Sequence, residues 1–216
     1  MGGDSLMLKV GLTGAVASGK STAARVLAQE GIPVLDADRV VHDLYERDPG
    51  TIEEVLRAFP EASDGGGGID RAALGRTAFA GGGNLRRLED IVHPRVMEYI
   101  SSWFARQKHA PAAVVEAALW HRLDARRGLD ILVTVLADEA VRRRRLRKRG
   151  LPPDQVEARL HAQGPMPAQD DARHWVVINE GPLSRFEDDI RNLAARLRQR
   201  AREEGETRTR DGNTRD

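Results

Sequence analysis

The sequence contains no cysteine and few aromatic residues, which make up 4% of its 216 residues. The absence of cysteine excludes disulfides, thiolate metal sites and cysteine nucleophiles. No apolar run approaches the roughly 20 residues that a membrane-spanning helix needs. Residues 1–6 also lack the basic segment and apolar run of a secretory signal. We therefore expect a cytoplasmic protein with no membrane partner.

An excess of one charge is also lacking, because 34 basic and 33 acidic residues leave a formal net charge of only +1. Such a chain has no overall attraction for nucleic acid or for an anionic membrane. We expect no nucleic-acid partner, and a monomer or small homo-oligomer. Lysine itself is scarce, since it occurs only at positions 9, 20, 108 and 148 and the other 30 basic residues are arginine. A position that uses lysine therefore has some reason to do so, and Lys20 is the one that matters below.

Short apolar runs alternate with longer amphipathic patterns along the chain. We predict five strands, at Met7–Leu12, Ile32–Leu35, Ala112–Val115, Ile131–Leu136 and Trp175–Ile178. Helical patterns lie between them, and the clearest is the last, with apolar residues every three or four positions from Leu183 to Leu197. This alternation predicts an α/β fold, a three-layer sandwich with a mostly parallel five-stranded sheet covered on both faces.

Two regions interrupt this alternation. Residues 61–110 hold two Gly-rich stretches and a helical pattern that we expect to break near His93-Pro94, so we interpret them as a helical insertion. Residues 140–172 form a charged excursion within a core made of residues 1–60 and 111–201. Residues 202–216 contain no apolar side chain, so we predict a disordered tail.

The loop after the first predicted strand matches G-x-x-x-x-G-K-[ST] over residues 14–21. A loop that wraps a polyphosphate must point successive backbone N–H groups inward, and its two glycines give the backbone that freedom. The helix that follows adds the positive end of its dipole. In this pattern Lys20 reaches the β- and γ-phosphates, Ser21 ligates Mg²⁺ and Thr22 donates to the α-phosphate. The alternative is a Gly-rich turn that binds nothing.

The pattern predicts a P-loop NTPase-type fold with ATP and Mg²⁺ as cofactors. The expected nucleotide-binding residues are Gly14, Ala15, Val16, Ala17, Ser18, Gly19, Lys20, Ser21 and Thr22.

Two carboxylates, Asp36 and Asp38, follow the second predicted strand. Ligands of open α/β sheets collect at the carboxyl ends of the strands. Phosphoryl transfer needs a group that orients the attacking hydroxyl and accepts its proton, and Asp38 is our candidate for this base. Asp36 is a candidate for supporting Mg²⁺ through water. The alternative for each is that it caps the following helix.

With these residues in view, the chain resembles the dephospho-CoA kinase family. Residues 31–38 are similar to the family's G-x-x-v-i-D-A-D segment, and residues 70–79 to its D-R-x-x-L-G-x-x-v-F stretch. Residues 88–94 are similar to its L-x-x-i-x-H-P element, 159–163 to its R-x-x-x-Q and 177–181 to its V-I-x-N-x-G. The match runs in order from about residue 8 to residue 200.

The resemblance implies a kinase with a nucleotide core, a helical acceptor-binding part at 61–110 and a lid at 140–172. It implies transfer of the ATP γ-phosphate to the ribose 3′-hydroxyl of dephospho-CoA, which gives coenzyme A and ADP. The residues that it implicates are Lys20, Asp38 and Arg144 in catalysis, Lys148 and Asn179 in nucleotide binding, and Asp36, Asp38, Arg71, His93 and Arg95 in acceptor binding.

The chain departs from the family after the third predicted strand, where P-L-L-x-E is usual and residues 116–120 read Glu-Ala-Ala-Leu-Trp. Other readings also stay open. The basic run at 142–149 supplies a transition-state cation through Arg144 or Lys148, binds nucleic acid, or is a solvated helix face. His93 is an acceptor contact or a buried structural histidine. The alternative functions are a nucleoside or nucleotide kinase, or a nucleotide-binding switch, against which the absence of an N/T-K-x-D motif counts.

Overall fold

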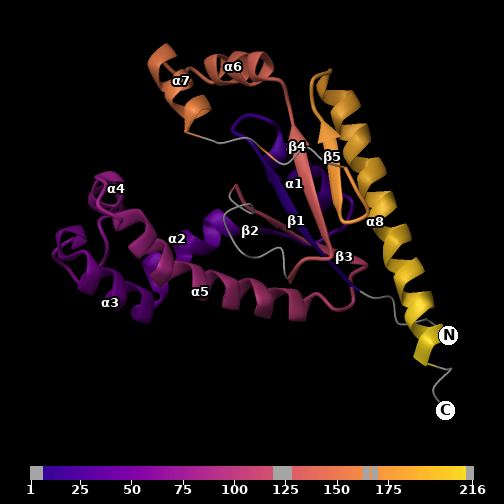
Figure 1. Ribbon diagram of the computed structural model, residues 1–216, viewed down its shortest axis with the longest axis horizontal. Helices are drawn as coiled ribbons and strands as arrows, with labels where there is room; N and C mark the ends of the chain where they lie inside the picture. The colour runs from indigo at the N-terminus through magenta and orange to yellow at the C-terminus, as the bar shows by residue number, and fades with distance from the viewer. Residues whose placement is uncertain (1–6, 119–127, 163–165, 167–169, 213–216) are drawn as a thin grey trace. The chain divides into compact units, whose positions relative to one another are not determined.

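The computed structural model describes residues 7–118, 128–162, 166 and 170–212 (Figure 1). The chain divides into two compact units, Met1–Leu35 with Phe104–Asp216, and Asp36–Trp103. We call the first the core unit and the second the helical unit. The helical unit begins earlier than the insertion expected at 61–110, because two helices between residues 37 and 58 pack with its other elements.

The core unit contains a five-stranded parallel sheet in the order β2-β3-β1-β4-β5. Its strands are β1 (Leu8–Gly14), β2 (Val34–Asp36), β3 (Ala112–Glu116), β4 (Ile131–Leu136) and β5 (His174–Ile178). The pairings of β1 with β3, β1 with β4 and β4 with β5 are parallel. The register sets Leu12 opposite Glu116 and Gly14 opposite Val135, so the strands end along one edge of the sheet. The predicted α/β fold class with a five-stranded parallel sheet is confirmed.

Two helices, α1 (Lys20–Gln29) and α8 (Leu183–Gly212), pack against the same apolar core. Alternate side chains of a strand lie on one face, and β1 contributes Leu8, Val10 and Leu12 to this core. Leu27 of α1 and Ile190 of α8 join them and are almost fully buried. Each such burial contributes about 1.5–3 kcal/mol. The core therefore fixes the end of β1, and with it the loop that leads to α1.

The final helix is longer than the sequence predicts. We expected a disordered tail from residue 202, but α8 continues to Gly212, and residues 213–216 lie outside the described part of the chain. Ala201 is fully buried, and two side-chain hydrogen bonds span it, from Gln199 to Glu203 and from Arg200 to Glu204. Such pairs stabilise a helix without apolar side chains. Composition alone therefore gave the wrong result for this segment.

The helical unit consists of α2 (Ala37–Arg47), α3 (Pro49–Ala58), a 3₁₀ turn (Pro60–Ala62), α4 (Arg71–Phe79) and most of α5 (Asn84–Arg106). The carboxylates of Asp36, Asp48 and Asp70 accept backbone N–H bonds at the starts of α2, α3 and α4. A cap of this kind satisfies backbone donors that lack partners within the helix. Two of these aspartates, Asp36 and Asp70, lie in the family-like segments 31–38 and 70–79, so each of these segments also contains the start of a helix.

The predicted break at His93-Pro94 is wrong, because α5 is continuous with Pro94 inside it. A proline removes one hydrogen bond of a helix and crowds the preceding turn. The apolar stripe Val92, Val96 and Ile100 is 3% exposed or less. Packing of this stripe offsets the defect and carries the helix through the proline.

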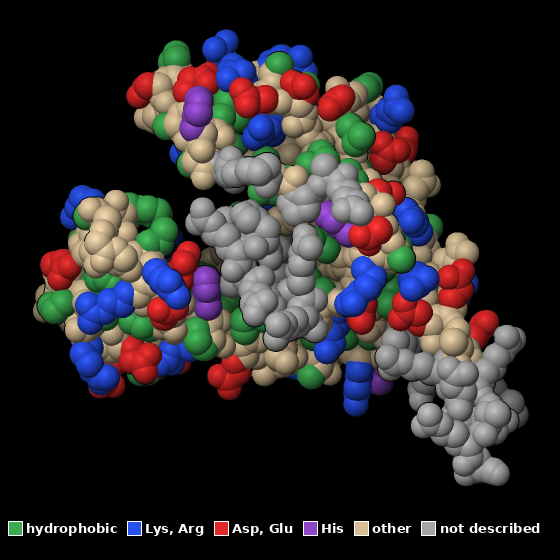
Figure 2. Space-filling view, in the orientation of Figure 1, with side chains coloured by type: hydrophobic (Ala, Val, Ile, Leu, Met, Phe, Trp, Pro, Cys, Tyr) green, Lys and Arg blue, Asp and Glu red, His purple; other side chains and the backbone are tan. Residues whose placement is uncertain are grey.

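The surface carries charges of both signs. On the face that Figure 2 shows, basic and acidic side chains are interspersed, in agreement with the balanced net charge. None of the described helices is long and apolar enough to cross a membrane.

Candidate active site

The loop between β1 and α1 has a backbone that favours small residues. A Cβ atom on Gly14 would lie 2.6 Å from the carbonyl oxygen of Val135, and one on Gly19 would collide with the side chain of Asn179. Gly19 has a φ of 115° and Ala17 a φ of 61°. The left-handed conformation costs a residue with a side chain about 1–2 kcal/mol, so the packing around Ala17 must offset that cost. Tight turns with such residues form backbone nests that bind anions.

A buried carboxylate lies beside the first residues of α1. Glu116, the last residue of β3, accepts hydrogen bonds from Lys20 Nζ at 2.8 Å and from Ser21 Oγ at 3.1 Å on the same oxygen, Oε1. The Lys20 and Glu116 side chains are 15% and 10% exposed. Glu116 reaches them because the sheet register places it opposite Leu12, two residues before Gly14. The sequence flagged Glu116 only as a departure from the family pattern, and its pairing depends on a register that the sequence does not reveal.

The outer side of the loop is bonded to Asn179, which follows β5. The Asn179 side chain donates from Nδ2 to the Ser18 carbonyl oxygen at 2.7 Å and is buried. We predicted that Asn179 binds nucleotide. In the structure its side chain contacts the loop backbone, and nucleotide binding stays a prediction.

Among the arginines of α6 (Glu139–Lys148), Arg145 contacts the loop. It donates to the carbonyl oxygens of Ala17 and Ser18 and to Asn179. Arg144 and Lys148 are exposed on the same helix, so both cations face solvent. The sequence missed Arg145 because the run of four arginines gives no signal that selects one of them.

A second arginine joins the two helices of the predicted lid, α6 and α7 (Pro153–His161). Arg143 donates to both carboxylate oxygens of Glu157, at 2.7 and 2.8 Å, and to Glu139 at 2.8 Å. The Arg143 hydrogen bonds lower the pKa of the Glu157 carboxyl. Beneath this clamp Leu146, Val156 and Leu160 form an apolar cluster that includes Ala17 and Val16 of the loop.

The two candidate acceptor-side carboxylates differ in their local roles. Asp36 Oδ1 accepts from the backbone N–H groups of Asp38 at 2.9 Å and Arg39 at 3.2 Å, so Asp36 is the N-cap of α2. This is the capping alternative considered for it. Asp38 lies in the first turn of α2 and its side chain is exposed to solvent.

The other three predicted acceptor-binding residues, Arg71, His93 and Arg95, lie on α4 and α5. Arg71, at the start of α4, donates from Nη1 to His42 Nδ1 at 2.9 Å. Burial raises the pKa of the Tyr45 hydroxyl, and the charge of Arg71 lowers that pKa to a smaller extent. Tyr45 therefore also lies near Arg71. His93 is half-buried on α5.

Arg95, also on α5, forms ion pairs with residues around α3. Its guanidinium lies 2.9 Å from Glu54 and 3.6 Å from Asp48. These contacts give Arg95 a structural role within the helical unit in addition to the one predicted for it.

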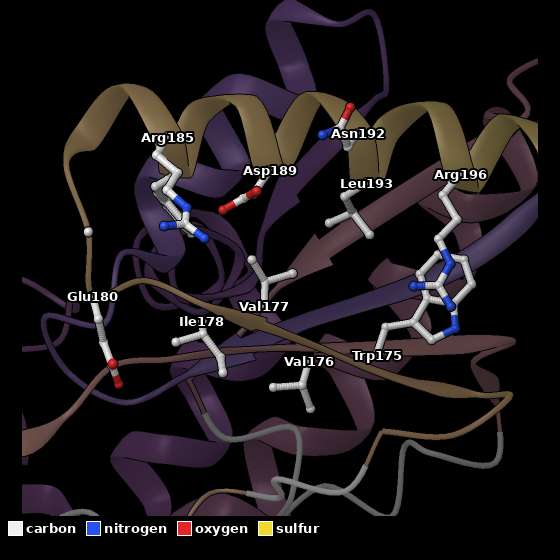
Figure 3. Close-up of a pocket in the computed structure, with 12 residues that line it drawn as sticks. Trp175, Val176, Val177, Ile178, Glu180, Arg185, Asp189, Asn192, Leu193 and Arg196 are labelled. Atoms are coloured by element: carbon white, nitrogen blue, oxygen red, sulfur yellow. The ribbon is translucent and has the colours of Figure 1, made fainter.

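A pocket of about 520 Å³ lies between β5 and α8 (Figure 3). Arg196 stacks over the Trp175 ring at 4.0 Å from its centroid, while Arg185 and Asp189 line the pocket nearer the start of α8. None of its lining residues belongs to the glycine-rich loop or to Glu116. This pocket is therefore not the phosphate site.

Solved structures of other proteins share the fold of this chain. A structure titled TT1252 from Thermus thermophilus is 33% identical, with a TM-score of 0.74 over 89% of this chain and 98% of that one. The dephospho-CoA kinase of Campylobacter jejuni shares the fold, with a TM-score of 0.58 at 17% identity over 88% of this chain and 97% of that one. The parallel sheet, the glycine-rich loop and these neighbours define an α/β protein with a P-loop-type fold.

The sequence comparisons define the family. A family model described as dephospho-CoA kinase matches residues 8–185. The dephospho-CoA kinase of Corynebacterium glutamicum is 33% identical over 195 residues, which cover 88% of this chain and 100% of the relative. That of Symbiobacterium thermophilum is 37% identical over 180 residues, 82% of this chain and 75% of the relative. The chain belongs to the dephospho-CoA kinase family, as the sequence motifs predicted.

Proposed function

We propose that this protein transfers the γ-phosphate of ATP to the ribose 3′-hydroxyl of dephospho-CoA, giving coenzyme A and ADP. The observation that carries the proposal is the arrangement of Lys20, Ser21 and Glu116 at the end of a glycine-rich loop, in a chain of this family. Dephospho-CoA enters the proposal from the family, and the chemistry below is derived from the residues of this chain.

The loop binds the polyphosphate of ATP. Its backbone N–H groups and the start of α1 supply partial positive charge without a side chain. Lys20 adds a full charge beside them. In the structure the Lys20 ammonium forms an ion pair with Glu116, with Nζ 2.8 Å from Oε1. We propose that Lys20 shares its charge with the β- and γ-phosphates when ATP is bound, as a lysine at this position of the loop does.

The residues beside Lys20 also suit Mg²⁺. This cation prefers oxygen ligands and is usually held by one or two carboxylates together with substrate phosphates. Ser21 Oγ and Glu116 Oε1 lie 3.1 Å apart at the start of α1, which brings a hydroxyl and a carboxylate oxygen together. Ser21 would ligate the ion, and Glu116 would hold it directly or through water. When bound, Mg²⁺ neutralises charge on the phosphates.

The transfer itself needs a base and a cation. Asp38 accepts the proton of the ribose 3′-hydroxyl, the hydroxyl oxygen bonds to the γ-phosphorus, and the bond from that phosphorus to the β–γ bridging oxygen breaks. ADP leaves with the electron pair of that bond. Arg144 and Lys148, whose side chains are exposed on α6, supply the cations that balance the transition-state charge.

The acceptor is held by the helical unit. Arg71 and His93 are our candidates for its polar contacts, with Arg95 and Asp36 in supporting positions. Arg71 suits an anionic group because guanidinium forms bidentate bonds to phosphate. Its bond to His42 orients it within the unit.

An acceptor screen with product analysis tests this proposal. The protein is incubated with Mg·ATP and either dephospho-CoA, adenosine or a nucleoside monophosphate, and ADP release and product mass are measured. We expect fast ADP release only with dephospho-CoA, and a product phosphorylated at the ribose 3′ position. Faster turnover on the nucleoside or nucleotide would replace this substrate assignment with a nucleoside or nucleotide kinase.

A further inference from the structure

The guanidinium of Arg145 is bonded on both sides to the backbone around the phosphate loop. Nη1 donates to the carbonyl oxygens of Ala17 and Ser18, each at 3.1 Å. Nη2 donates to the backbone oxygen of Asn179 at 3.0 Å and to its Oδ1 at 2.9 Å. Asn179 in turn donates to the Ser18 carbonyl. The loop between β1 and α1, the lid helix α6 and the end of β5 thus meet at one planar cation.

These bonds determine which way the next amide points. In a trans peptide the carbonyl and the following N–H point in opposite directions, and the chain contains no cis peptide among its described residues. The Ser18 carbonyl accepts from Arg145 and from Asn179, so both of its lone pairs are directed to the outside of the loop. The N–H of Gly19 must therefore point the other way, where a loop of this type binds phosphate. Hydrogen bonds to the carbonyl also polarise that N–H.

The same stretch of α6 contacts the loop a second time through apolar atoms. Leu146, the residue after Arg145, belongs to the cluster that contains Ala17. Ala17 is the residue held at a φ of 61°. Its side chain packs in that cluster while its carbonyl oxygen accepts from Arg145. The strained turn is therefore held at both its side chain and its carbonyl by consecutive residues of one helix.

We propose that Arg145 is a positioning residue that sets the direction of the Gly19 amide and couples the lid helix to nucleotide affinity. The inference rests on the proposed function, because it assumes that this loop binds a polyphosphate. It assigns Arg145 no contact with substrate. Arg144 and Lys148 keep their roles toward the phosphates.

The geometry calls for arginine rather than any cation. A planar guanidinium presents donors on two sides and reaches three carbonyl oxygens and an amide oxygen at once, which a lysine ammonium on a flexible stem does not reproduce. Burial and the neighbouring Arg144 and Arg149 lower the pKa of Arg145, but a guanidinium starts so high that it stays charged. Its charge therefore also lies behind the loop that receives the phosphates.

The test uses Arg145→Lys and Arg145→Gln in the full chain. The control is Arg147→Lys, two residues along the same helix at an exposed position. Binding of Mg·ADP is measured by titration calorimetry without acceptor, thermal midpoints are recorded, and the amide shift of Gly19 is followed by NMR in the nucleotide-free protein. We expect both Arg145 variants to bind Mg·ADP about tenfold more weakly or worse, with a shifted Gly19 amide, while the control matches the wild type.

The outcomes separate this inference from the proposed function. If wild-type protein fails to bind Mg·ADP, the phosphate role of the loop is wrong, and the inference fails with it. If wild-type protein binds and Arg145→Lys binds within twofold of it, only the role of Arg145 is wrong. An unchanged Gly19 amide together with a lowered thermal midpoint would mean that Arg145 acts as a structural staple, which also overturns the inference. Because Arg145→Lys keeps the charge, it separates the two-sided contact from charge alone.

Discussion

At the scale of single residues, Lys20 is the cation that the glycine-rich loop supplies to the phosphates in the proposed mechanism. The chain uses lysine at only four positions, and this one ends the glycine-rich loop and bonds Glu116 at 2.8 Å. We predict that Lys20→Ala lowers kcat for ADP release by about a hundredfold or more, because transition-state charge on the phosphates loses the cation that the loop supplies. Lys108→Ala, at an exposed lysine, is the matched control. Full activity of Lys20→Ala would remove the loop from the mechanism.

Substitution of Glu116 tests whether this carboxylate helps to bind Mg²⁺. Glu116→Gln keeps the size and a hydrogen-bonding oxygen but removes the charge. We predict that it raises the Mg²⁺ concentration needed for half-maximal activity by about tenfold, which corresponds to about 1.4 kcal/mol of lost interaction with the ion. Rates are measured across a Mg²⁺ titration at saturating ATP. If the variant loses rate equally at every Mg²⁺ concentration, Glu116 orients Lys20 and Ser21 and has no part in metal binding.

Contacts between residues close in the sequence could be predicted, but contacts between distant residues could not. The spacing of the glycine-rich loop predicted its glycines and Lys20 as neighbours because that contact is local. The partnership of Lys20 with Glu116 spans 96 residues and depends on the register between β1 and β3. Asp36 could be predicted only as far as two alternatives, and its side chain turned out to cap α2.

At the scale of elements, helix caps give a prediction for the helical unit. Asp48 caps α3 by accepting from the backbone N–H and the hydroxyl of Thr51, at 2.7 and 2.5 Å. These bonds and, to a smaller extent, the charge of Arg95 hold the pKa of the Asp48 carboxyl below its usual range. We predict that Asp48→Ala destabilises the helical unit by about 1 kcal/mol at neutral pH in urea unfolding.

The sign of the pH dependence follows from that lowered pKa. A carboxyl with a lowered folded-state pKa contributes stability that is present above its unfolded pKa and is lost as the pH falls through the folded value. The stability difference between wild type and Asp48→Ala should therefore shrink from about pH 4 to pH 2. Asp90→Asn, at an exposed position of α5, is the control. A difference that stays constant to pH 2 would mean that the cap does not depend on the carboxylate charge.

The elements themselves were predicted better than their ends and interruptions. All five strands lie where apolar runs indicated, because burial in a parallel sheet requires such runs. The unbroken α5 and the extension of α8 were missed for a shared reason. Pro94 and the charged segment after Ala201 are both poor helix signals locally, and both are carried by packing or side-chain pairing along the rest of the helix.

At the scale of the whole molecule, the two compact units predict two separate responses to ligands. We expect Mg·ADP to slow amide hydrogen exchange in the core unit, at the loop after β1 and the start of α1. We expect dephospho-CoA alone to slow exchange in the helical unit, at the start of α4 and the middle of α5, where Arg71 and His93 lie. A ligand that binds the native state protects the region that it contacts. Protection by dephospho-CoA confined to the core unit would contradict the proposed acceptor role of α4 and α5.

The most direct measurement compares nucleotide binding with turnover in Asp38→Asn. The loop at residues 14–22 binds the phosphates and Asp38 accepts the proton, so the two functions should separate in this variant. We predict that Mg·ATP binding, measured by calorimetry, stays within about twofold of wild type, while the rate of dephospho-CoA-dependent ADP release falls by about a hundredfold or more. An Asp38→Asn variant that turns over at the wild-type rate would contradict the account.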